Sequence, residues 1–283
     1  MILIFAGCAV LSPVSSGLER LAVFPGIEDV QPRWQVFTGG VNFFQGMTGS
    51  VWLSSDAYPL LRFYALQVDL LHPAVEIVVK SGSSGRHVSG FVRDNDLAAG
   101  INALPFDIVY LREGRPIQNI GLVVSNGLLL SPAYPHFDAL VFYNNGRAAI
   151  VSQSSVHSTE NIKNAAGGFN QILADGEPVE RILSLKVRHP RSAAGVSSDG
   201  RFLYLLVIDG RRAGSIGATE KDTALLLRSL GAYSGINFDG GGSSALVLRL
   251  NDGRIRTVNI PIHAGVPGLE RPVAGSIGIR DIR

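Results

Sequence analysis

One stretch of the sequence, INFDGGGSSALVL at residues 236–248, restricts the fold more than any other. It places a carboxylate, three consecutive glycines and two serines between two apolar runs that are typical of strands. Each glycine that is ordered by folding costs roughly 0.5–1 kcal/mol relative to alanine. Three glycines in a row therefore indicate a backbone that turns sharply or comes very close to another strand or to a ligand.

The composition favours a globular protein and excludes several functions. Of the 283 residues, 46% are hydrophobic and 17% are charged, which is enough apolar material for a large core. The net charge is +2 and no basic run alternates with aromatic residues, so we expect no nucleic-acid partner. The single cysteine excludes an intrachain disulfide framework, and no two of the six histidines have helix-face spacing. We therefore expect no protein-built metal site and no cofactor.

The N-terminal sequence MILIFAGCAVLSP resembles the lipobox of a bacterial lipoprotein, in which Cys8 would carry the lipid. The apolar run before the cysteine is short and lacks Lys and Arg, so an ordinary apolar N-terminal strand is the alternative. We predict a truncated lipoprotein signal and linker at residues 1–20, and a membrane-anchored protein in the periplasm or at the cell surface. No later stretch reaches the roughly 18 uncharged apolar residues of a membrane span.

The remaining chain predicts an irregular N-terminal segment at residues 21–59 and one main domain at residues 60–283. Prolines and Gly39-Gly40 interrupt the first segment, whereas short alternating or β-branched runs follow from Leu60 onward. Asn-Gly or Asp-Gly pairs, which favour hairpin turns, separate several of these runs, at residues 126–127, 145–146, 175–176 and 199–200. We expect an α+β fold with a mixed, mostly antiparallel β-sheet and few helices.

Two segments predict helices. VSGFVRDNDLAAG, at residues 88–100, reads as a short helix that ends at Gly100. TEKDTALLLRSLG, at residues 219–231, has its own boundary signals: Thr219 can cap its start, and Gly231 can end it. Between these two helices, INALPFDIVYL at residues 101–111 is expected to return to strand.

Four polar features fall at strand ends or turns in the C-terminal half: HPRS at 189–192, DGRR at 209–212, GAT at 217–219 and DGGGSS at 239–244. Each alone has a structural explanation, such as a tight turn, a helix cap or a close strand crossing. Together they supply a pocket for an anionic ligand, because successive Gly and Ser amides form an anion-binding concavity and guanidinium groups bind phosphate. Asp209 and Asp239 are then candidates for sugar contacts, acid–base chemistry or orientation of the arginines.

The sequence from HPRSAAGV to DGGGSSALVL, residues 189–248, closely resembles the phosphodiester glycosidase family. An ordered set carries the resemblance: Arg, Asp-Gly-Arg, Gly-Ala-Thr and Asn-x-Asp-Gly-Gly-Gly-Ser-Ser. It extends more weakly to about Leu60 through YALQVDLLHPAVEIVV and AAGINALPFD. The resemblance implies an enzyme that hydrolyses a sugar-1-phosphodiester, with N-acetylglucosamine as the expected sugar, at the anomeric carbon.

The resemblance also implies roles for individual residues. Asp239, favoured over Asp209, would activate water or stabilise positive charge at the sugar, and Arg211 would stabilise the departing phosphate. The implied substrate-binding residues are Arg191, Asn102, Thr219, Asn237, Gly240, Gly241, Gly242, Ser243 and Ser244. Asn102 lacks the glycine and tyrosine that usually follow it in the family, and the neighbouring Arg212 leaves open which guanidinium points inward.

Envelope glycan or exopolysaccharide is the expected source of the substrate, and two other functions stay open. One is a noncatalytic envelope protein that keeps the fold and binds glycan or peptidoglycan. The other is an ordinary O-glycosidase, which needs two carboxylates facing each other about 5–5.5 or 6.5–9.5 Å apart, depending on its mechanism.

Overall fold

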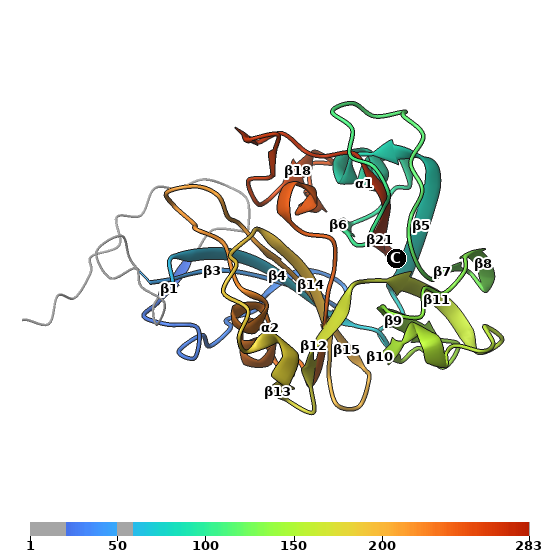
Figure 1. Ribbon diagram of the computed structural model, residues 1–283, viewed down its shortest axis with the longest axis horizontal. Coiled ribbons are helices and arrows are strands. Elements are labelled where there is room, and N and C mark those ends of the chain that lie inside the picture. Colours follow the sequence, from blue (N-terminus) through green and yellow to red (C-terminus); the bar gives the residue numbers. More distant parts are fainter. Residues whose placement is uncertain (1–20, 50–58, 283) are drawn as a thin grey trace, which may run out of the picture.

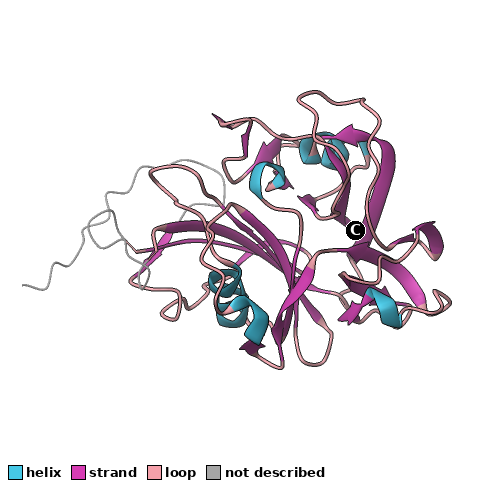
Figure 2. Ribbon diagram, in the orientation of Figure 1, coloured by secondary structure: helices cyan, strands magenta, loops and turns pink. Residues whose placement is uncertain are grey.

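The computed structural model describes residues 21–49 and 59–282 and consists mainly of β-sheet, with α-helices at Val88–Asp94 (α1) and Glu220–Leu230 (α2) in this part of the chain (Figures 1 and 2). The lipobox prediction, with Cys8, lies outside these residues. None of the helices in the described ranges is long and apolar enough to cross a membrane.

The largest sheet has nine strands in the order β1-β3-β4-β15-β14-β16-β12-β13, with β2 paired to β3. The pair β1–β3 is parallel and the other pairs are antiparallel, which confirms the predicted mixed, mostly antiparallel sheet. Its strands are β1 (Ala22–Phe24), β2 (Gln35–Thr38), β3 (Val41–Thr48), β4 (Leu61–Asp69), β12 (Asn170–Ala174), β13 (Glu177–Pro178), β14 (Arg191–Val196), β15 (Phe202–Ile208) and β16 (Ser234–Asn237).

Two five-stranded antiparallel sheets and one hairpin complete the fold. One has the order β10-β9-β11-β7-β8 and contains β7 (Val123–Ser125), β8 (Leu128–Ser131), β9 (Asp138–Tyr143), β10 (Ala148–Ser152) and β11 (Ile162–Gly167). The other has the order β18-β17-β6-β21-β5 and contains β5 (Val75–Arg86), β6 (Ala99–Asn102), β17 (Leu246–Arg249), β18 (Ile255–Thr257) and β21 (Val273–Asp281). The hairpin pairs β19 (Ile262–His263) with β20 (Val266–Pro267).

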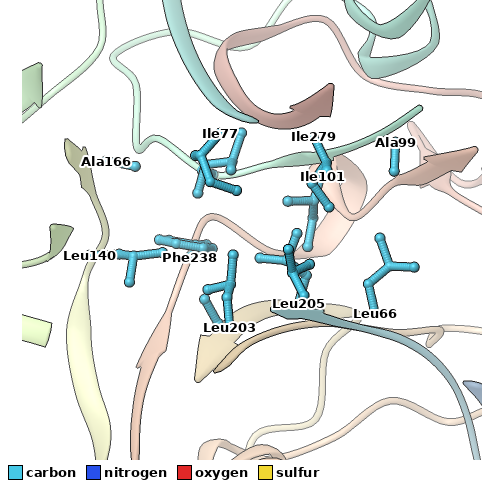
Figure 3. Close-up of a cluster of buried hydrophobic side chains, with 14 of the residues drawn as sticks. Leu66, Ile77, Ala99, Ile101, Leu140, Ala166, Leu203, Leu205, Phe238 and Ile279 are labelled. Atoms are coloured by element: carbon cyan, nitrogen blue, oxygen red, sulfur yellow. The ribbon is translucent and has the colours of Figure 1, made fainter. Parts of the chain in front are cut away.

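The main core lies where the three sheets meet (Figure 3). Leu66 and Leu205 come from the nine-stranded sheet, Ile101 from β6 and Leu140 from β9, and all four are fully shielded from solvent. The opposite face of the nine-stranded sheet is covered by α2, whose Leu226, Leu227 and Leu230 belong to a second apolar cluster. Because β14 and β16 are buried on both faces, the loops at their ends are held by rigid elements.

The predicted hairpins and the predicted helix at residues 219–231 agree with the structure. The first helix begins at Val88 as expected but ends at Asp94, and Gly100, expected to end it, lies in strand β6. Thr219 caps α2 in a capping box with Asp222, and Gly231 ends the helix at φ 111°. Turns at residues 126–127, 145–146, 175–176 and 199–200 connect β7–β8, β9–β10, β12–β13 and β14–β15, respectively.

The irregular N-terminal segment was expected to include early strands, and residues 35–48 form β2 and β3, with Val41 and Phe43 buried in the main core. One other segment differs from expectation. Residues 106–111, expected to be strand, form a loop with a single bridge at Phe106. Ile108, Val109 and Leu111 in this loop are exposed, so no partner strand pairs with their apolar run.

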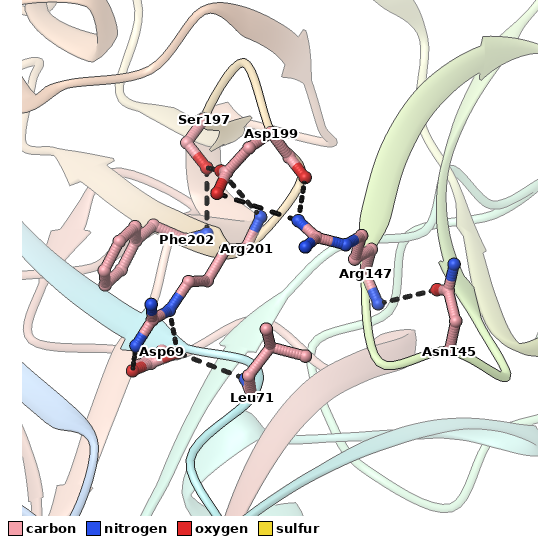
Figure 4. Close-up of polar contacts among 8 residues, drawn as sticks. All are labelled: Asp69, Leu71, Asn145, Arg147, Ser197, Asp199, Arg201 and Phe202. Atoms are coloured by element: carbon pink, nitrogen blue, oxygen red, sulfur yellow. Dashed lines mark hydrogen bonds and ion pairs between the residues drawn. The ribbon is translucent and has the colours of Figure 1, made fainter.

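The turn between β14 and β15 is tied to two neighbouring elements (Figure 4). Arg201 donates two hydrogen bonds to Asp69 at the end of β4, at 2.9 and 2.7 Å. Arg147, from the β9–β10 hairpin, donates to the main-chain carbonyl of Asp199. The Arg147 contact connects the nine-stranded sheet to the sheet that contains β9.

Candidate active site

The glycine-rich loop follows β16 and includes the short 3-10 helix η3 (Gly241–Ser243). Phe238 anchors its start in the main core. The amide of Asp239 donates to the carbonyl of Ala103 at 3.1 Å, and the amide of Gly241 donates to the carbonyl of Pro190 at 2.8 Å. Gly240 lies so close to Pro190 that a β-carbon there would be 2.8 Å from the Pro190 carbonyl oxygen. The glycines therefore let the backbone pass tightly between two other segments.

Two guanidinium groups lie against the same glycines. A β-carbon on Gly241 would be 3.0 Å from Nη2 of Arg211, and one on Gly242 would be 2.5 Å from Nη2 of Arg271. Gly241 also has φ +62°, a conformation that favours glycine. The three glycines thus allow two cations to approach one loop.

Asp239 lies beside this cationic surface and has a perturbed carboxyl group. The residue is partly buried, but its Oδ2 atom is shielded from solvent and has no hydrogen-bond partner. Burial raises the pKa of Asp239 to about 6, although a hydrogen bond from Ser243 and the charge of Arg271 act in the opposite direction. A carboxyl group with a pKa near neutrality can accept and return a proton under ordinary conditions.

Asn102 holds this loop in place. Its Nδ2 donates to the carbonyl of Asp239 at 2.5 Å. Its Oδ1 accepts from the Ser192 hydroxyl at 2.7 Å and from the Ala245 amide at 3.1 Å. The side chain is fully buried and all of these contacts are internal, so Asn102 fixes the position of Asp239.

Arg271 is a site residue that the sequence did not indicate. Its Nη1 donates to the Ser243 hydroxyl at 3.3 Å, and its Nε donates to Nδ1 of His263 at 3.2 Å. Burial lowers the pKa of Arg271, while Asp239 raises it and Arg211 lowers it. The residue lies about 30 positions beyond the glycines in the chain and outside the four polar features at residues 189–244, so its place beside the loop follows from the fold.

Asp209 is built into the interior. It is 1% exposed, and its Oδ1 accepts hydrogen bonds from the Ile260 amide at 2.9 Å and from Nδ2 of Asn259 at 3.4 Å. Its Oδ2 accepts from Arg212. Burial raises the pKa of Asp209, and the bond from Arg212 is the largest contribution in the opposite direction.

The adjacent arginines diverge. Arg212 binds the buried Asp209, whereas Arg211 is exposed, has φ +59°, and lies against Gly241. Nη2 of Arg211 also lies 3.4 Å from Nδ1 of His189, a second residue for which the sequence predicted no role. The structure therefore answers which guanidinium faces the glycine loop: it is that of Arg211.

Arg191 and Thr219 have structural partners near the start of α2. Arg191 donates to the carbonyl of Ala218 at 3.0 Å and lies 3.5 Å from Glu220. Burial lowers the pKa of Arg191, and Glu220 acts in the opposite direction. The Thr219 hydroxyl accepts from the Asp222 amide as part of the helix cap. Both side chains are thus committed to the helix end, although the Arg191 backbone lies close to Gly240.

Four of the remaining predicted ligands are buried, namely Asn237, Gly242, Ser243 and Ser244, and Gly240 and Gly241 are partly buried. Asn237 and Ser244 each have a buried side-chain oxygen without a partner, Oδ1 and Oγ respectively. The amides of Gly241, Ser243 and Ser244 all donate to backbone carbonyls. Most of the amides from Gly240 to Ser244, which were expected to form an anion-binding concavity, therefore stabilise the loop itself. The guanidinium groups of Arg211 and Arg271 supply most of the positive charge at this loop.

A cavity of about 470 Å³ lies elsewhere, between residues 26–29, residues 183–188 and the start of α2. Neither Asp239 nor Arg271 lines it, so we place the candidate site at the glycine loop, where the perturbed carboxyl and the cations meet. Within residues 21–49 and 59–282, no three His, Cys, Asp or Glu side chains are grouped to hold a metal ion.

The model of the phosphodiester glycosidase family matches residues 95–280, which is about two-thirds of the chain. This match confirms the resemblance carried by the Asp-Gly-Arg and glycine motifs, and it also includes Arg271. The chain belongs to the phosphodiester glycosidase family, a family of hydrolases.

Solved structures share the fold. The chain superposes on the zebrafish N-acetylglucosamine-1-phosphodiester α-N-acetylglucosaminidase catalytic domain, auto-inhibited by its pro-peptide, with a TM-score of 0.67, 17% identity and 89% coverage of each chain. A hypothetical protein from Synechocystis gives a TM-score of 0.62 at 14% identity, covering 85% of this chain and 62% of that one. A putative exported protein from Burkholderia pseudomallei gives 0.56 at 16% identity, covering 79% and 75%.

A curated relative matches part of the sequence. The prophage-derived uncharacterized protein YomE of Bacillus subtilis is 29% identical over an alignment of 137 residues, and the match covers 44% of this chain. The match spans about a fifth of the length of YomE, 21%.

Proposed function

We propose that this protein hydrolyses a sugar-1-phosphodiester at the anomeric carbon, and that the sugar is α-linked N-acetylglucosamine. The observation that carries the proposal is the meeting of one perturbed carboxyl group, Asp239, with the guanidinium groups of Arg211 and Arg271 on one glycine loop. Family membership supports the reaction class, and the zebrafish enzyme of the same fold supports the choice of sugar.

The two arginines bind the phosphate in this mechanism. A guanidinium presents paired N–H groups that match phosphate oxygens, and its charge counters the charge of the leaving phosphate. Phosphate departs more readily than a sugar alkoxide, so stabilisation of the anion matters more than protonation by an acid. Arg211 and Arg271 meet this need because both lie within contact of the loop that carries Asp239.

Asp239 acts as the base. Its ionised carboxylate takes a proton from the water that attacks the anomeric carbon, while the bond from that carbon to the phosphate oxygen breaks and its electron pair leaves with the phosphate. A pKa of about 6 leaves the group mostly ionised at pH 7 yet basic enough to accept the proton. A hydrogen bond from Ser243 and the charge of Arg271 favour the ionised form of the carboxyl group.

Asp209 is a positioning residue in this proposal. Both of its oxygens accept internal hydrogen bonds, so it offers no oxygen to a sugar or to water. An O-glycosidase needs two carboxylates that face the scissile bond. Asp209 cannot be the second of such a pair with Asp239, which favours phosphodiester cleavage. Substrate contacts by Arg191, Thr219, Asn237 and Ser244 stay predictions.

The test is release of free N-acetylglucosamine from a methyl phosphodiester of α-N-acetylglucosamine-1-phosphate by the purified protein. Asp239→Asn and Arg271→Met should each lower kcat/KM by at least about 100-fold, the effect of losing a catalytic base or an anion donor. Arg254→Ala, at an exposed arginine that bonds only Asp252, is the matched control.

The pH profile tests the role of Asp239. If it acts as a base, kcat/KM rises with pH through about pH 6 and then levels. A folded parent that turns over none of a panel of sugar-1-phosphodiesters would favour the noncatalytic glycan-binding alternative instead.

An extracytoplasmic location and a lipid anchor at Cys8 complete the proposal, with envelope glycan or exopolysaccharide as the source of substrate. They rest on the lipobox-like sequence AGC at residues 6–8. Metabolic labelling with a radioactive fatty acid should modify the wild-type protein and not Cys8→Ser. Absence of label from the wild-type protein would remove the anchor from the proposal.

A further inference from the structure

His263 is a buried histidine directly behind Arg271. It ends strand β19, is 2% exposed, and uses both ring nitrogens. Nδ1 lies 3.2 Å from Nε of Arg271, and Nε2 lies 3.0 Å from the carbonyl oxygen of Tyr110. A guanidinium N–H only donates and a carbonyl only accepts. The two bonds therefore require a neutral imidazole whose proton is on Nε2.

This bond orients the arginine. With Nε donating to His263, Nη1 of Arg271 reaches the Ser243 hydroxyl at 3.3 Å, and Nη2 lies against Gly242. The long side chain would otherwise sample several rotamers, since arginine loses much conformational freedom when it is fixed. His263 thus determines which edge of the guanidinium faces the glycine loop.

The surroundings of His263 oppose a second positive charge. Arg271 and His87 both face it, and burial together with these two groups lowers the pKa of His263. The carboxylates of two residues on neighbouring segments have other partners: Glu113 lies 3.6 Å from His87, and Glu270 accepts from the Ser89 amide and the Thr257 hydroxyl. Protonation at Nδ1 would remove the acceptor for Arg271 and place two cations in contact.

We propose that His263 is a positioning residue that holds Arg271 in its phosphate-binding orientation, and that a protonated His263 releases it. The proposal rests on the proposed function insofar as the ligand of Arg271 is a phosphate group. Its first part, the neutral imidazole bound to Arg271, is independent of any activity.

The first test is NMR of the protein labelled with ¹⁵N-histidine. The His263 ring should give the pattern of a neutral imidazole protonated at Nε2, and that pattern should change in Arg271→Met, which lacks the Nε donor. His157, which is exposed, serves as the internal reference and should not change. A His263 ring protonated at Nδ1, or one indifferent to Arg271→Met, would overturn the proposal.

The second test is calorimetric binding of inorganic phosphate at pH 8. His263→Ala should weaken binding about tenfold, the effect of losing one hydrogen bond to a charged group. His263→Gln should lose less than about threefold, because its amide oxygen can accept from Arg271 while its nitrogen donates to Tyr110. His157→Gln is the matched control and should bind like the parent. Equal phosphate affinity in folded His263→Ala and the parent would contradict the proposal.

The pH dependence separates positioning from a structural role. Between pH 8 and pH 5 the ratio of phosphate affinities, parent to His263→Gln, should fall, because only the parent can protonate at this position. The titration of phosphate itself is common to both proteins and cancels in the ratio. A constant ratio would exclude release by protonation. If the parent binds no phosphate and hydrolyses no substrate, the proposed function fails, whereas the NMR result still decides the role of His263.

Discussion

Asp209 and Asp239 are connected through Asn259 and the glycine-rich loop. Asn259 donates from Nδ2 to Oδ1 of Asp209 at 3.4 Å and to the carbonyl of Ser244 at 2.9 Å, and the neighbouring Ser243 bonds to Asp239. Asp209 has partners on both carboxylate oxygens, whereas Oδ2 of Asp239 is buried without one. Burial raises the pKa of both carboxyl groups, but Asp209 also forms an ion pair with Arg212 that its loss would break. The two residues should therefore respond oppositely to mutation.

Asp239→Asn should raise the stability of the protein while it removes activity. The folded pKa of about 6 exceeds the ordinary value of 3.8, so ionisation on folding is unfavourable and stability falls as pH rises from about 4 to above 6. The variant does not ionise and should gain on the order of 3 kcal/mol over the parent at pH 8, and almost nothing at pH 4. Urea denaturation at the two pH values measures this. A variant less stable than the parent at pH 8 would show that the interactions of the ionised form with Ser243 and Arg271 outweigh the cost of its burial.

Asp209→Asn should destabilise the fold. It removes a buried negative charge from Arg212 and leaves an uncompensated guanidinium, at a cost of roughly 3–5 kcal/mol. Thermal unfolding should show the loss, and any residual activity should follow the folded fraction. Asp252→Asn, at an exposed turn, should change stability by less than about 0.5 kcal/mol. An Asp209→Asn variant that is as stable as the parent but inactive would instead identify Asp209 as a catalytic residue.

Gly242→Ala should displace Arg271. The added methyl group would lie 2.5 Å from Nη2, closer than real contacts allow, and the flexible guanidinium is the part that can move. We expect kcat/KM to fall by roughly tenfold to 100-fold, as when one anion donor is removed, with a smaller effect on melting temperature. Gly82→Ala is the control, because its β-carbon would meet only ordinary contacts, 3.5 Å or longer. Full activity in Gly242→Ala would show that the position of Arg271 does not matter.

Arg211→Gly should separate stability from function. Arg211 has φ +59°, a conformation that is less favourable for a non-glycine residue than for glycine by about 1 kcal/mol. The variant should therefore be as stable as the parent or slightly more stable, yet bind phosphate at least about tenfold more weakly. Asp175→Gly, at φ 52° in the β12–β13 turn, should show the same stability change with unchanged activity. If both variants keep phosphate binding, Arg211 is not a ligand.

Much of the local structure follows from the sequence. The boundaries of α2 depend on Thr219, Asp222 and Gly231, which act within a few residues of one another. Asn-Gly and Asp-Gly pairs specify hairpin turns for the same reason, because the backbone conformation that they favour is a property of the pair itself. The apolar run at 106–111 was misleading, since exposure of Ile108 and Val109 depends on the absence of a neighbouring strand in the fold.

The sequence by itself also determined the family and the glycine loop and singled out Asp239 as a candidate, because the DGGGSS motif is contiguous and its glycines are needed wherever a backbone must approach closely. Only the tertiary structure decided which arginine and which aspartate face that loop. Arg211 and Arg212 are adjacent in sequence and chemically identical, and a left-handed φ at Arg211 separates their directions. Arg271 and His263 reach the site from the C-terminal hairpin region through contacts that no local pattern encodes.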